Sequence, residues 1–498
     1  MRDRFLNQLR TLSSTEANRV ALEDDTRSIR YGELMTLVES RARQLRRLGS
    51  RRVGLALDNG IDWALWDLAM MQETIVNVPL PGFFTPAQLA HVVDQAGVDT
   101  LIGPEPLASA LRFEAGHDAM LWRRPMSTPP PALPEGTHKI TFTSGTSGTP
   151  KGVCLSSDNQ LSVAASLAQV ADSVGVRRHL ALLPLATLLE NIGGLYAPLW
   201  LGGSVSLPSL ATLGWKGASG FDSAAGWQVI HRQAPDSLIL VPQLLSALLT
   251  QQGEKPLDFG RFFAVGGAAV SPALLTRAER AGWPVFEGYG LSECASVVTL
   301  NRPGECCPGS VGKPLPHARV SLSEDGEVLV QGNVMLGYLG DQTPAPDVWP
   351  TGDLGEWDGD NLTLKGRRRQ VFITAYGRNV DPAWVEAELT AEPAIAQAWV
   401  TGEAQTANRA LLVPRGDWVN DRQIEEAVAR ANARLPDYAR VSRWQRSAPF
   451  TPQNGQATAN GRLRRDVLAA HYSTWLESPV PDSADPRNIR PSSEETTP

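Results

Sequence analysis

Helix and strand patterns alternate through the first three hundred residues, and this alternation constrains the fold more than any other feature. Residues 31–48 place apolar side chains near one helical face and end at Gly49, a residue that favours the left-handed backbone of a helix end. A strand pattern follows at residues 53–57, and strands and helices then take turns up to a helix that begins at Thr85-Pro86. This order predicts a mostly parallel sheet covered by helices.

The pattern changes twice toward the C-terminus. Residues 309–364 show short strands separated by turns, which predicts a small β subdomain. After Gly366 a compact α+β unit of roughly a hundred residues follows. We therefore predict an α/β fold with a large N-terminal domain, residues 1–368, made of two parallel-rich α/β subdomains and the small β subdomain. A smaller α+β C-terminal domain should span residues 369–475, and residues 476–498, rich in Pro, Ser, Asp and Glu, should be a disordered tail.

The overall composition excludes several classes of protein. The 498 residues carry a net charge of −7, which argues against a protein that grips nucleic acid. Four cysteines give no disulfide framework, the adjacent Cys306-Cys307 suit neither a bridge nor a zinc site, and Cys154 is expected to be a packing residue. These features favour a cytoplasmic protein. The uncharged residues 191–215 contain five glycines and two prolines, so we predict buried strand and turn there instead of a transmembrane helix. Contact of this region with a membrane surface stays open.

The most informative segment is TFTSGTSGTPKGV, residues 141–153. Its glycines let backbone N–H groups approach an anion, its hydroxyls donate further hydrogen bonds, and Lys151 adds positive charge. Composition alone does not separate this segment from a Ser/Gly-rich surface loop. A Walker-type phosphate loop is excluded, because it needs glycine directly before the lysine, where this chain has Pro150.

The loop resembles the signature of the adenylate-forming superfamily, which comprises acyl-CoA synthetases, luciferases and the adenylation domains of peptide synthetases. That signature is tyrosine or phenylalanine followed by TSGTTGxPKG, and only Ser147 differs here. The resemblance implies ATP as a substrate, transfer of its adenylyl group to a carboxylate, and release of pyrophosphate. It places at the nucleotide Thr143, Ser144, Gly145, Thr146, Ser147, Gly148 and Lys151, with Thr143 and Lys151 also in catalytic roles.

Further motifs follow in the order that the superfamily has them. Gly266-Gly267-Ala268-Ala269 resembles its adenine-contacting turn, which implies nucleotide contacts for the first three residues. FEGYGLSE, residues 286–293, matches its YGxTE element with Ser292 in place of threonine. By this resemblance Tyr289 stacks on adenine, Glu293 is catalytic and helps to hold Mg²⁺, and the nucleotide site also includes Gly290 and Ser292.

The remaining site residues come from the C-terminal third of the chain. Thr351-Gly352-Asp353 matches the motif whose aspartate accepts hydrogen bonds from the ribose hydroxyls, and Gly366-Arg367 matches the motif whose arginine lies near ribose and phosphate. The resemblance further implies that the C-terminal domain is mobile and turns about Arg369, and that Arg462 supplies the catalytic cation of the first half-reaction.

Three segments are most similar to long-chain acyl-CoA synthetases and favour a fatty or other hydrophobic carboxylic acid. They are LPLATLLE at residues 183–190, RNVDPAWVE at 378–386 and FTPQNGQATANGRLRR at 450–465. The resemblance implies a thiol acceptor, either CoA or the phosphopantetheine of an acyl carrier protein. It leaves open the identity and chain length of the acid.

Three positions depart from the family pattern. Thr187 stands where these relatives usually have histidine, Arg462 where the superfamily has a lysine that bridges carboxylate and α-phosphate, and Tyr376 where a glycine is usual near the pantetheine tunnel. The leading hypothesis is an acid–thiol ligase that tolerates arginine. The alternatives are adenylation of an aryl or specialised biosynthetic acid for loading a carrier protein, and a nucleotide-binding homologue with weakened catalysis.

Overall fold

A computed structural model gives the fold of the chain. It describes residues 1–118, 120–125, 129–144, 150–217, 220–253, 255–341, 343–368, 370–375, 378–458 and 461–477, and the side chains of these residues except 116–118, 144 and 379. The predicted tail beyond Glu477, the loop residues Gly145, Thr146, Ser147 and Gly148, the side chain of Ser144, and Arg369 and Tyr376 lie outside this description.

The first large sheet carries the two strands that flank the phosphate-loop segment. Its inner strands pair in parallel, whereas the strands at both ends of the sheet pair antiparallel. Its strand order is β21 (Gly337–Tyr338), β9 (Pro150–Leu155), β8 (Lys139–Ser144), β4 (Val76–Pro79), β3 (Arg52–Leu55), β5 (Thr100–Ile102), β7 (Leu121–Arg123) and β6 (Glu114–Asp118).

The second large sheet is parallel from β16 to β1 and antiparallel at both ends. Its strand order is β18 (Lys313–Pro314), β17 (Ser296–Leu300), β16 (Val285–Leu291), β15 (Phe262–Val265), β14 (Ser237–Leu240), β10 (Arg178–Leu180), β11 (Ser204–Ser206), β1 (Val20–Glu23) and β2 (Ser28–Arg30). The principal helices of the N-terminal domain are α1 (Arg2–Thr15), α2 (Tyr31–Leu48), α3 (Ile61–Glu73), α4 (Pro86–Ala96), α5 (Glu105–Ala110), α6 (Ser157–Ser173), α9 (Ser223–Gln233), α10 (Pro242–Gln251) and α11 (Pro272–Arg280).

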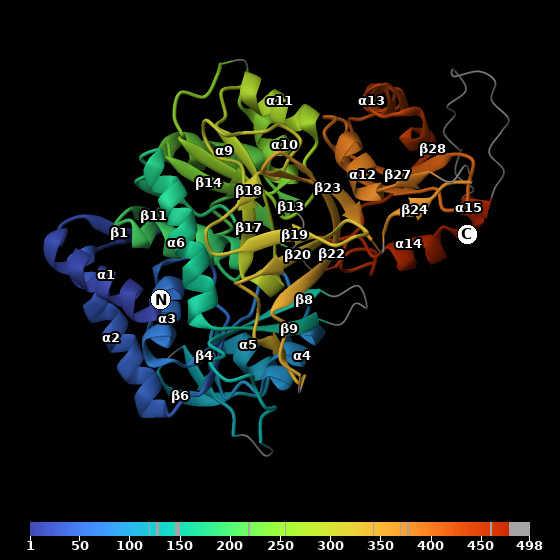
Figure 1. Cartoon of the computed structure of the whole chain (residues 1–498). Helices are drawn as coiled ribbons and strands as arrows, with labels where there is room; N and C mark the ends of the chain where they lie inside the picture. The colour runs from blue at the N-terminus through green and yellow to red at the C-terminus, as the bar shows by residue number, and fades with distance from the viewer. Residues whose placement is uncertain are drawn as a thin grey trace.

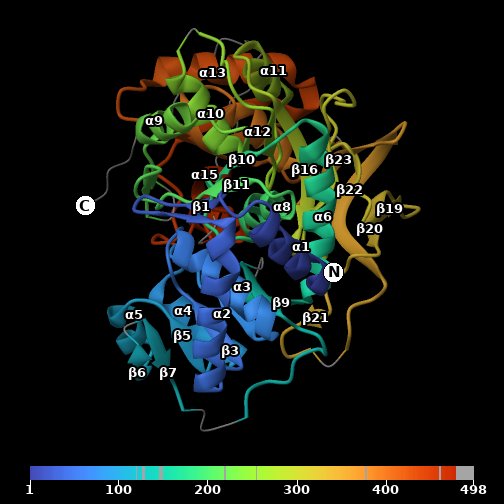
Figure 2. The same cartoon turned by 90° about the vertical axis from the view of Figure 1, so that its left-hand side faces the viewer.

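A smaller antiparallel sheet and the C-terminal unit complete the architecture. The small sheet has the order β19 (Arg319–Leu322), β20 (Glu327–Gln331), β22 (Val348–Asp358) and β23 (Asn361–Arg367). The C-terminal unit is built on β26 (Ile395–Thr401), β27 (Asn408–Pro414) and β28 (Val441–Arg446), with α12 (Pro382–Thr390), α13 (Asp421–Arg434), α14 (Arg465–His471) and α15 (Ser473–Glu477). Figure 1 shows this orange and red unit beside the green helices α10 and α11, and Figure 2 shows the same neighbours from the side. The predicted α/β fold class is confirmed.

Capping residues in the sequence correctly predicted where several helices begin or end. Helix α2 covers Tyr31–Leu48, and Gly49 ends it with φ of +64°. Helix α4 begins after Thr85, whose hydroxyl accepts a hydrogen bond from the backbone of Gln88 while the Gln88 side chain caps Thr85 in return.

The prediction for residues 191–215 was partly wrong. Its first part is helical, with a π-helical turn at Asn191–Tyr196 followed by α8 (Ala197–Trp200), and β11 comes only afterwards. The two glycines of the π-helical turn are needed for close packing, since a Cβ on Gly194 would lie 1.9 Å from Oε1 of Glu190. Gly202 and Gly214, further along, do have the positive φ of turn residues. In the part of the chain that is described, no helix is both long and apolar enough to cross a membrane.

A buried polar network joins β8 to the π-helical turn and to α3. The ammonium group of Lys139, with 1% of its side chain exposed, donates hydrogen bonds to Oδ1 of Asp67 at 3.0 Å and to the hydroxyl of Tyr196 at 3.0 Å. Asp67, which is 0% exposed, also accepts hydrogen bonds from Tyr196, Asn191 and Asn77. Because β8 leads directly into the phosphate-loop segment, this network fixes the base of that segment to the core.

Candidate functional site

The hairpin of β8 and β9 presents the two ends of the phosphate-loop segment. Thr143 on β8 lies opposite Lys151 on β9 in the antiparallel register. Thr143 is half-buried, whereas Lys151 is exposed and its Nζ lies 5.6 Å from the centre of the Tyr338 ring. The two predicted residues at the base of the loop therefore face the same region.

Tyr338 also contacts the predicted metal ligand. Its hydroxyl donates a hydrogen bond to Oε1 of Glu293 at 2.8 Å, and the backbone N–H of Met335 donates to the carbonyl of Glu293 at 2.6 Å. Burial and the Glu293 carboxylate raise the pKa of Tyr338, so its hydroxyl stays protonated and can donate. Tyr338 thus links Lys151 to Glu293. The sequence analysis missed Tyr338, because its role depends on the pairing of β21 with β9, which no local pattern reveals.

The β22–β23 hairpin brings the predicted ribose-binding residues together. Asp353 lies directly opposite Arg367 in the register, and Nε of Arg367 donates to Oδ1 of Asp353 at 2.8 Å. The hydroxyl of Tyr289 donates to Oδ2 of the same carboxylate at 2.7 Å. Burial and the Asp353 charge raise the pKa of Tyr289, so this hydroxyl also remains a donor. The Asp353 carboxylate is therefore held in place from both sides by residues that the motifs had singled out.

The glycine-rich turn after β15 lies against β16. The backbone N–H of Gly266 donates to the carbonyl of Leu240 at 3.1 Å, and Gly267 has φ of +80°. A Cβ on Gly266 would lie 2.7 Å from the carbonyl oxygen of Gly288, so the two chain segments can meet this closely only with glycine at that position. The same holds for Gly290, where a Cβ would lie 1.6 Å from the carbonyl oxygen of Ser296.

A buried carboxyl group lies under this turn. Glu287 on β16 is 8% exposed, and the backbone N–H of Val270 donates to its side chain. Burial raises the pKa of Glu287 to about 8. No sequence pattern distinguishes Glu287 from the rest of the FEGYGLSE element.

Arg462 comes from the C-terminal domain and interacts electrostatically with the site in the N-terminal domain. Its turn is closed by two hydrogen bonds, from the Arg462 N–H to the hydroxyl of Thr458 at 3.0 Å and from the Thr458 N–H to the Arg462 carbonyl at 2.7 Å. The residue as a whole is exposed, yet desolvation is the largest effect on the guanidinium and lowers its pKa. The charge of Arg367 lowers this pKa further, while Glu293 and Asp353 oppose the shift. The structure thus brings Arg462 within electrostatic range of all three residues.

The segment at residues 183–190 has a clear structural role. Glu190 is fully buried, where its Oε1 lies 2.9 Å from Nε2 of His179 and its Oε2 accepts a hydrogen bond from the backbone N–H of Leu183 at 2.9 Å. The hydroxyl of Thr187 donates to the carbonyl of Pro184 at 2.7 Å, within its own turn. Thr187 therefore stabilises the backbone at a place where the resemblance led us to expect a histidine.

Two family models match the chain. The family model described as AMP-binding enzyme matches residues 10–339, and the model described as AMP-binding enzyme C-terminal domain matches residues 369–479. A long-chain-fatty-acid–CoA ligase of Mycobacterium bovis is 34% identical over 248 aligned positions, and the match covers 43% of this chain and 41% of that protein. The matched region therefore spans about two fifths of that relative.

Solved structures share the fold. An anthranilate CoA ligase in complex with anthranoyl-AMP has a TM-score of 0.77 at 20% identity, covering 94% of this chain and 96% of that one. The o-succinylbenzoate CoA synthetase of Bacillus subtilis in complex with ATP and magnesium ion has a TM-score of 0.72 at 22% identity, covering 92% and 98%. The family model alone covers well over half of the sequence, and the chain belongs to the family of AMP-binding enzymes.

Proposed function

We propose that this protein is an ATP- and Mg²⁺-dependent acid–thiol ligase that activates a hydrophobic carboxylic acid as its acyl-adenylate. The observation that carries the proposal is that Arg462 of the C-terminal domain interacts electrostatically with Glu293, Asp353 and Arg367 of the N-terminal domain. Positive and negative groups arranged in this way suit a reaction in which charge is redistributed around a phosphate. The match to the AMP-binding family model supports the same chemistry.

In the first half-reaction a carboxylate oxygen of the acid attacks the α-phosphorus of ATP. The new P–O bond gives acyl-AMP, and the bond to the β-phosphate oxygen breaks to release pyrophosphate. We assign Lys151 and the loop after Thr143 to the phosphates, Asp353 to the ribose hydroxyls, and Arg462 to the negative charge that builds at the α-phosphate. Arg367 orients Asp353 through the hydrogen bond between their side chains.

The side chain of Glu293 suits a magnesium ion bound together with phosphates. Its Oε1 is oriented by Tyr338, and its Oε2 accepts no hydrogen bond from any described residue. Among the described residues, no three His, Cys, Asp or Glu side chains come together as a metal site. A single carboxylate plus phosphate oxygens is a common way to bind Mg²⁺, which would supply positive charge to the phosphates of ATP. We assign Tyr338 to holding the Glu293 carboxylate in place.

In the second half-reaction a thiol sulfur attacks the acyl carbon, and AMP leaves with the electron pair of the C–O bond. The product is a thioester. We favour CoA as the thiol, because the relative that is 34% identical is named a CoA ligase. The phosphopantetheine of a carrier protein is the alternative acceptor.

We favour a fatty acid as the substrate. The 34% identical relative is named for long-chain fatty acids, and three segments of this chain resemble long-chain acyl-CoA synthetases. An aryl acid is the second candidate, since solved structures of the same fold carry the names of aryl-acid ligases.

Acid-dependent release of pyrophosphate from Mg-ATP tests the proposal directly. Fatty acids of several lengths and a panel of aryl acids would be compared, with Arg462→Lys measured in parallel. We expect release with fatty acids, which would also show that arginine suffices at this position. Release only with aryl acids would replace the substrate assignment. No release from the natural protein but recovery in Arg462→Lys would overturn the ligase assignment in favour of a nucleotide-binding protein with weakened catalysis.

A further inference from the structure

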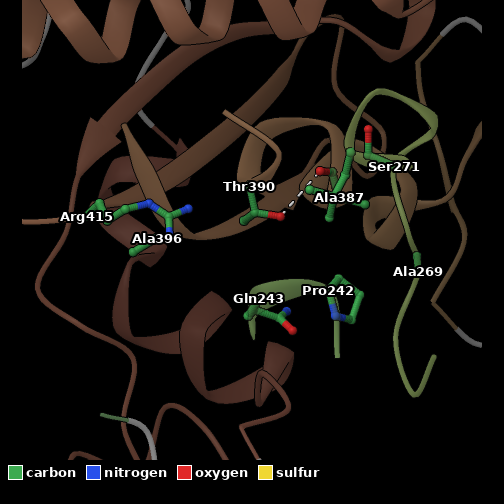
Figure 3. A pocket seen from close by; sticks show the side chains of 9 residues that line it. Pro242, Gln243, Ala269, Ser271, Ala387, Thr390, Ala396 and Arg415 are labelled. Atoms are coloured by element: carbon green, nitrogen blue, oxygen red, sulfur yellow. Dashed lines mark hydrogen bonds between the residues drawn. The ribbon is translucent and has the colours of Figure 1, made fainter. Parts of the chain in front are cut away.

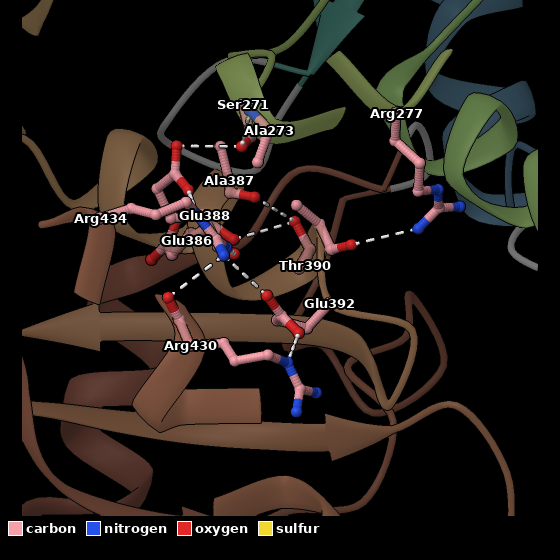
Figure 4. Close-up of polar contacts among 11 residues, drawn as sticks. Ser271, Ala273, Arg277, Glu386, Ala387, Glu388, Thr390, Glu392, Arg430 and Arg434 are labelled. Carbon is pink, nitrogen blue, oxygen red and sulfur yellow. Dashed lines mark hydrogen bonds and ion pairs between the residues drawn. The ribbon is translucent and has the colours of Figure 1, made fainter. Parts of the chain in front are cut away.

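Among the described residues, three hydrogen bonds join the C-terminal domain to helices α10 and α11. The hydroxyl of Ser271 donates to Oε1 of Glu388 at 2.9 Å, as Figure 4 shows. Nη1 of Arg277 donates to the carbonyl of Ala391 at 3.4 Å, and Nη2 of Arg415 donates to the hydroxyl of Ser246 at 3.3 Å. Ser271 is 2% exposed and Glu388 is 4% exposed, so the first of these bonds is shielded from water.

The C-terminal domain holds Glu388 rigidly. Nε of Arg434 on α13 donates to Oε2 of Glu388 at 2.6 Å, and Nη2 of the same arginine donates to the Glu388 carbonyl at 3.0 Å. Arg434 and Arg430 are in turn anchored by the buried Glu392, at 2.9 Å and 2.7 Å (Figure 4). The carboxylate of Glu388 is therefore fixed before it meets Ser271, which lowers the entropy cost of the contact.

Ser271 connects this contact to the nucleotide side of the site. Its hydroxyl oxygen accepts a hydrogen bond from the backbone N–H of Ala273 at 3.1 Å and so caps the N-terminus of α11. Only two residues separate Ser271 from Ala268, the last residue of the glycine-rich turn expected at adenine. Any displacement of Glu388 therefore acts on a segment close to the nucleotide.

A small pocket and two like charges lie beside these hydrogen bonds in the interface. Figure 3 shows a small pocket between the two domains, with Ala269 and Ser271 on one side and Ala387, Thr390 and Arg415 on the other. Two positive groups also lie close together here, since desolvation and the neighbouring charge of Arg277 lower the pKa of Arg415 to about 10. Because this interface contains a pocket and two like charges, individual hydrogen bonds strongly influence the position of one domain relative to the other.

We propose that Ser271 and Glu388 are positioning residues that hold the C-terminal domain where Arg462 meets Glu293 and Asp353. This inference rests on the proposed function for its kinetic consequence. Because Arg462 acts at the α-phosphate, the contact matters for adenylation. Transfer of the acyl group to the thiol does not use Arg462 in the same way and proceeds without the contact.

The decisive variant is Ser271→Asp. Aspartate caps a helix as well as serine does, so α11 keeps its N-terminus, but the new carboxylate repels Glu388. We expect acid-dependent pyrophosphate release to slow by roughly tenfold or more. The rate of thioester formation from preformed acyl-AMP should stay within about twofold of the natural protein.

Two companion variants separate positioning from folding. Ser271→Asn keeps the cap and offers an amide donor to Glu388, so it should recover most of the adenylation rate. Ser156→Asp makes the same chemical change at the N-cap of α6, far from the interface in sequence, and should leave both half-reactions unchanged. Adding Glu388→Gln to Ser271→Asp replaces repulsion by an amide-to-carboxylate hydrogen bond and should restore adenylation in part.

Equal loss in both half-reactions, or normal adenylation by Ser271→Asp, would overturn the inference. Small-angle scattering supplies a readout that needs no turnover, because Ser271→Asp should show a larger radius of gyration than Ser271→Asn. If no acid yields pyrophosphate with the natural protein, the proposed function fails. The scattering comparison still decides whether the contact positions the domain.

Discussion

Replacing Lys139 by methionine should lower the free energy of unfolding of the N-terminal domain by about 3 kcal/mol. Methionine matches the length of the lysine side chain and fills its space, but it leaves the Asp67 carboxylate without a cation at a site with no solvent exposure. Removing one partner of a buried ion pair typically costs about 3–5 kcal/mol. Asp67 retains hydrogen bonds from Asn77, Asn191 and Tyr196, which places the cost at the lower end of that range.

The expected change in melting temperature follows from the size of the domain. Unfolding entropies of about 2.1 cal/mol/K per residue give roughly 0.8 kcal/mol/K for a domain the size of residues 1–368, so a loss of 3 kcal/mol corresponds to about 4 °C. Differential scanning calorimetry at pH 7 would measure the midpoint. Adding Asp67→Asn removes the uncompensated charge, so the double variant should melt above Lys139→Met alone. A single variant that melts within about 1 °C of the natural protein would refute the reasoning.

Three further outcomes follow from the same structure. Glu293→Ala should abolish Mg-ATP-dependent pyrophosphate release and leave the circular dichroism spectrum unchanged, and near-normal activity would contradict its assignment to Mg²⁺. Arg462→Ala should slow acyl-AMP formation much more than thiol transfer from preformed acyl-AMP, and equal losses in the two assays would show that Arg462 does not act at the α-phosphate. Glu287→Gln should reduce the loss of stability with rising pH. The pKa of Glu287 is about 8 in the folded protein and about 4.5 in the unfolded chain. Between these values the unfolded state loses the proton first, so the natural protein becomes less stable as pH rises. In urea titrations the free energy of unfolding of the natural protein should fall by about 1.4 kcal/mol relative to that of the variant between pH 6.5 and pH 7.5. The same pH dependence of this free energy in both proteins would contradict the prediction.

Elements governed by local signals could be predicted from the sequence. Helix α2 ends at Gly49, and α4 begins at Thr85, because backbone conformation and capping there depend on neighbouring residues. The π-helical turn at Asn191–Tyr196 escaped prediction, since the nearby glycines read as turn residues. Gly194 makes room for the side chains of Glu190 and His179, and Gly193 makes room for the side chain of Ile239.

The candidate site likewise has features that the sequence predicts and features that it does not. Motif order singled out Tyr289, Glu293 and Asp353 as candidates, but it did not reveal that the Tyr289 hydroxyl donates a hydrogen bond to Asp353. That bond, like the contact of Tyr338 with Glu293, joins residues on different strands and depends on how the sheets are placed. Such pairings are set by the packing of whole sheets, so neither spacing nor composition encodes them locally.

The candidate site residues are far apart in the sequence, so the ribosome adds them at different times during protein synthesis. Arg462 follows Lys151 by 311 residues. At about 5–20 residues per second, the ribosome adds this arginine roughly 15 to 60 s after the lysine. For that interval the nascent N-terminal domain carries its loop lysine, its carboxylates and its aromatic residues without the cation from the C-terminal domain. If Arg462 is needed for adenylation, the N-terminal domain can fold during synthesis but cannot convert ATP to pyrophosphate until translation is nearly complete.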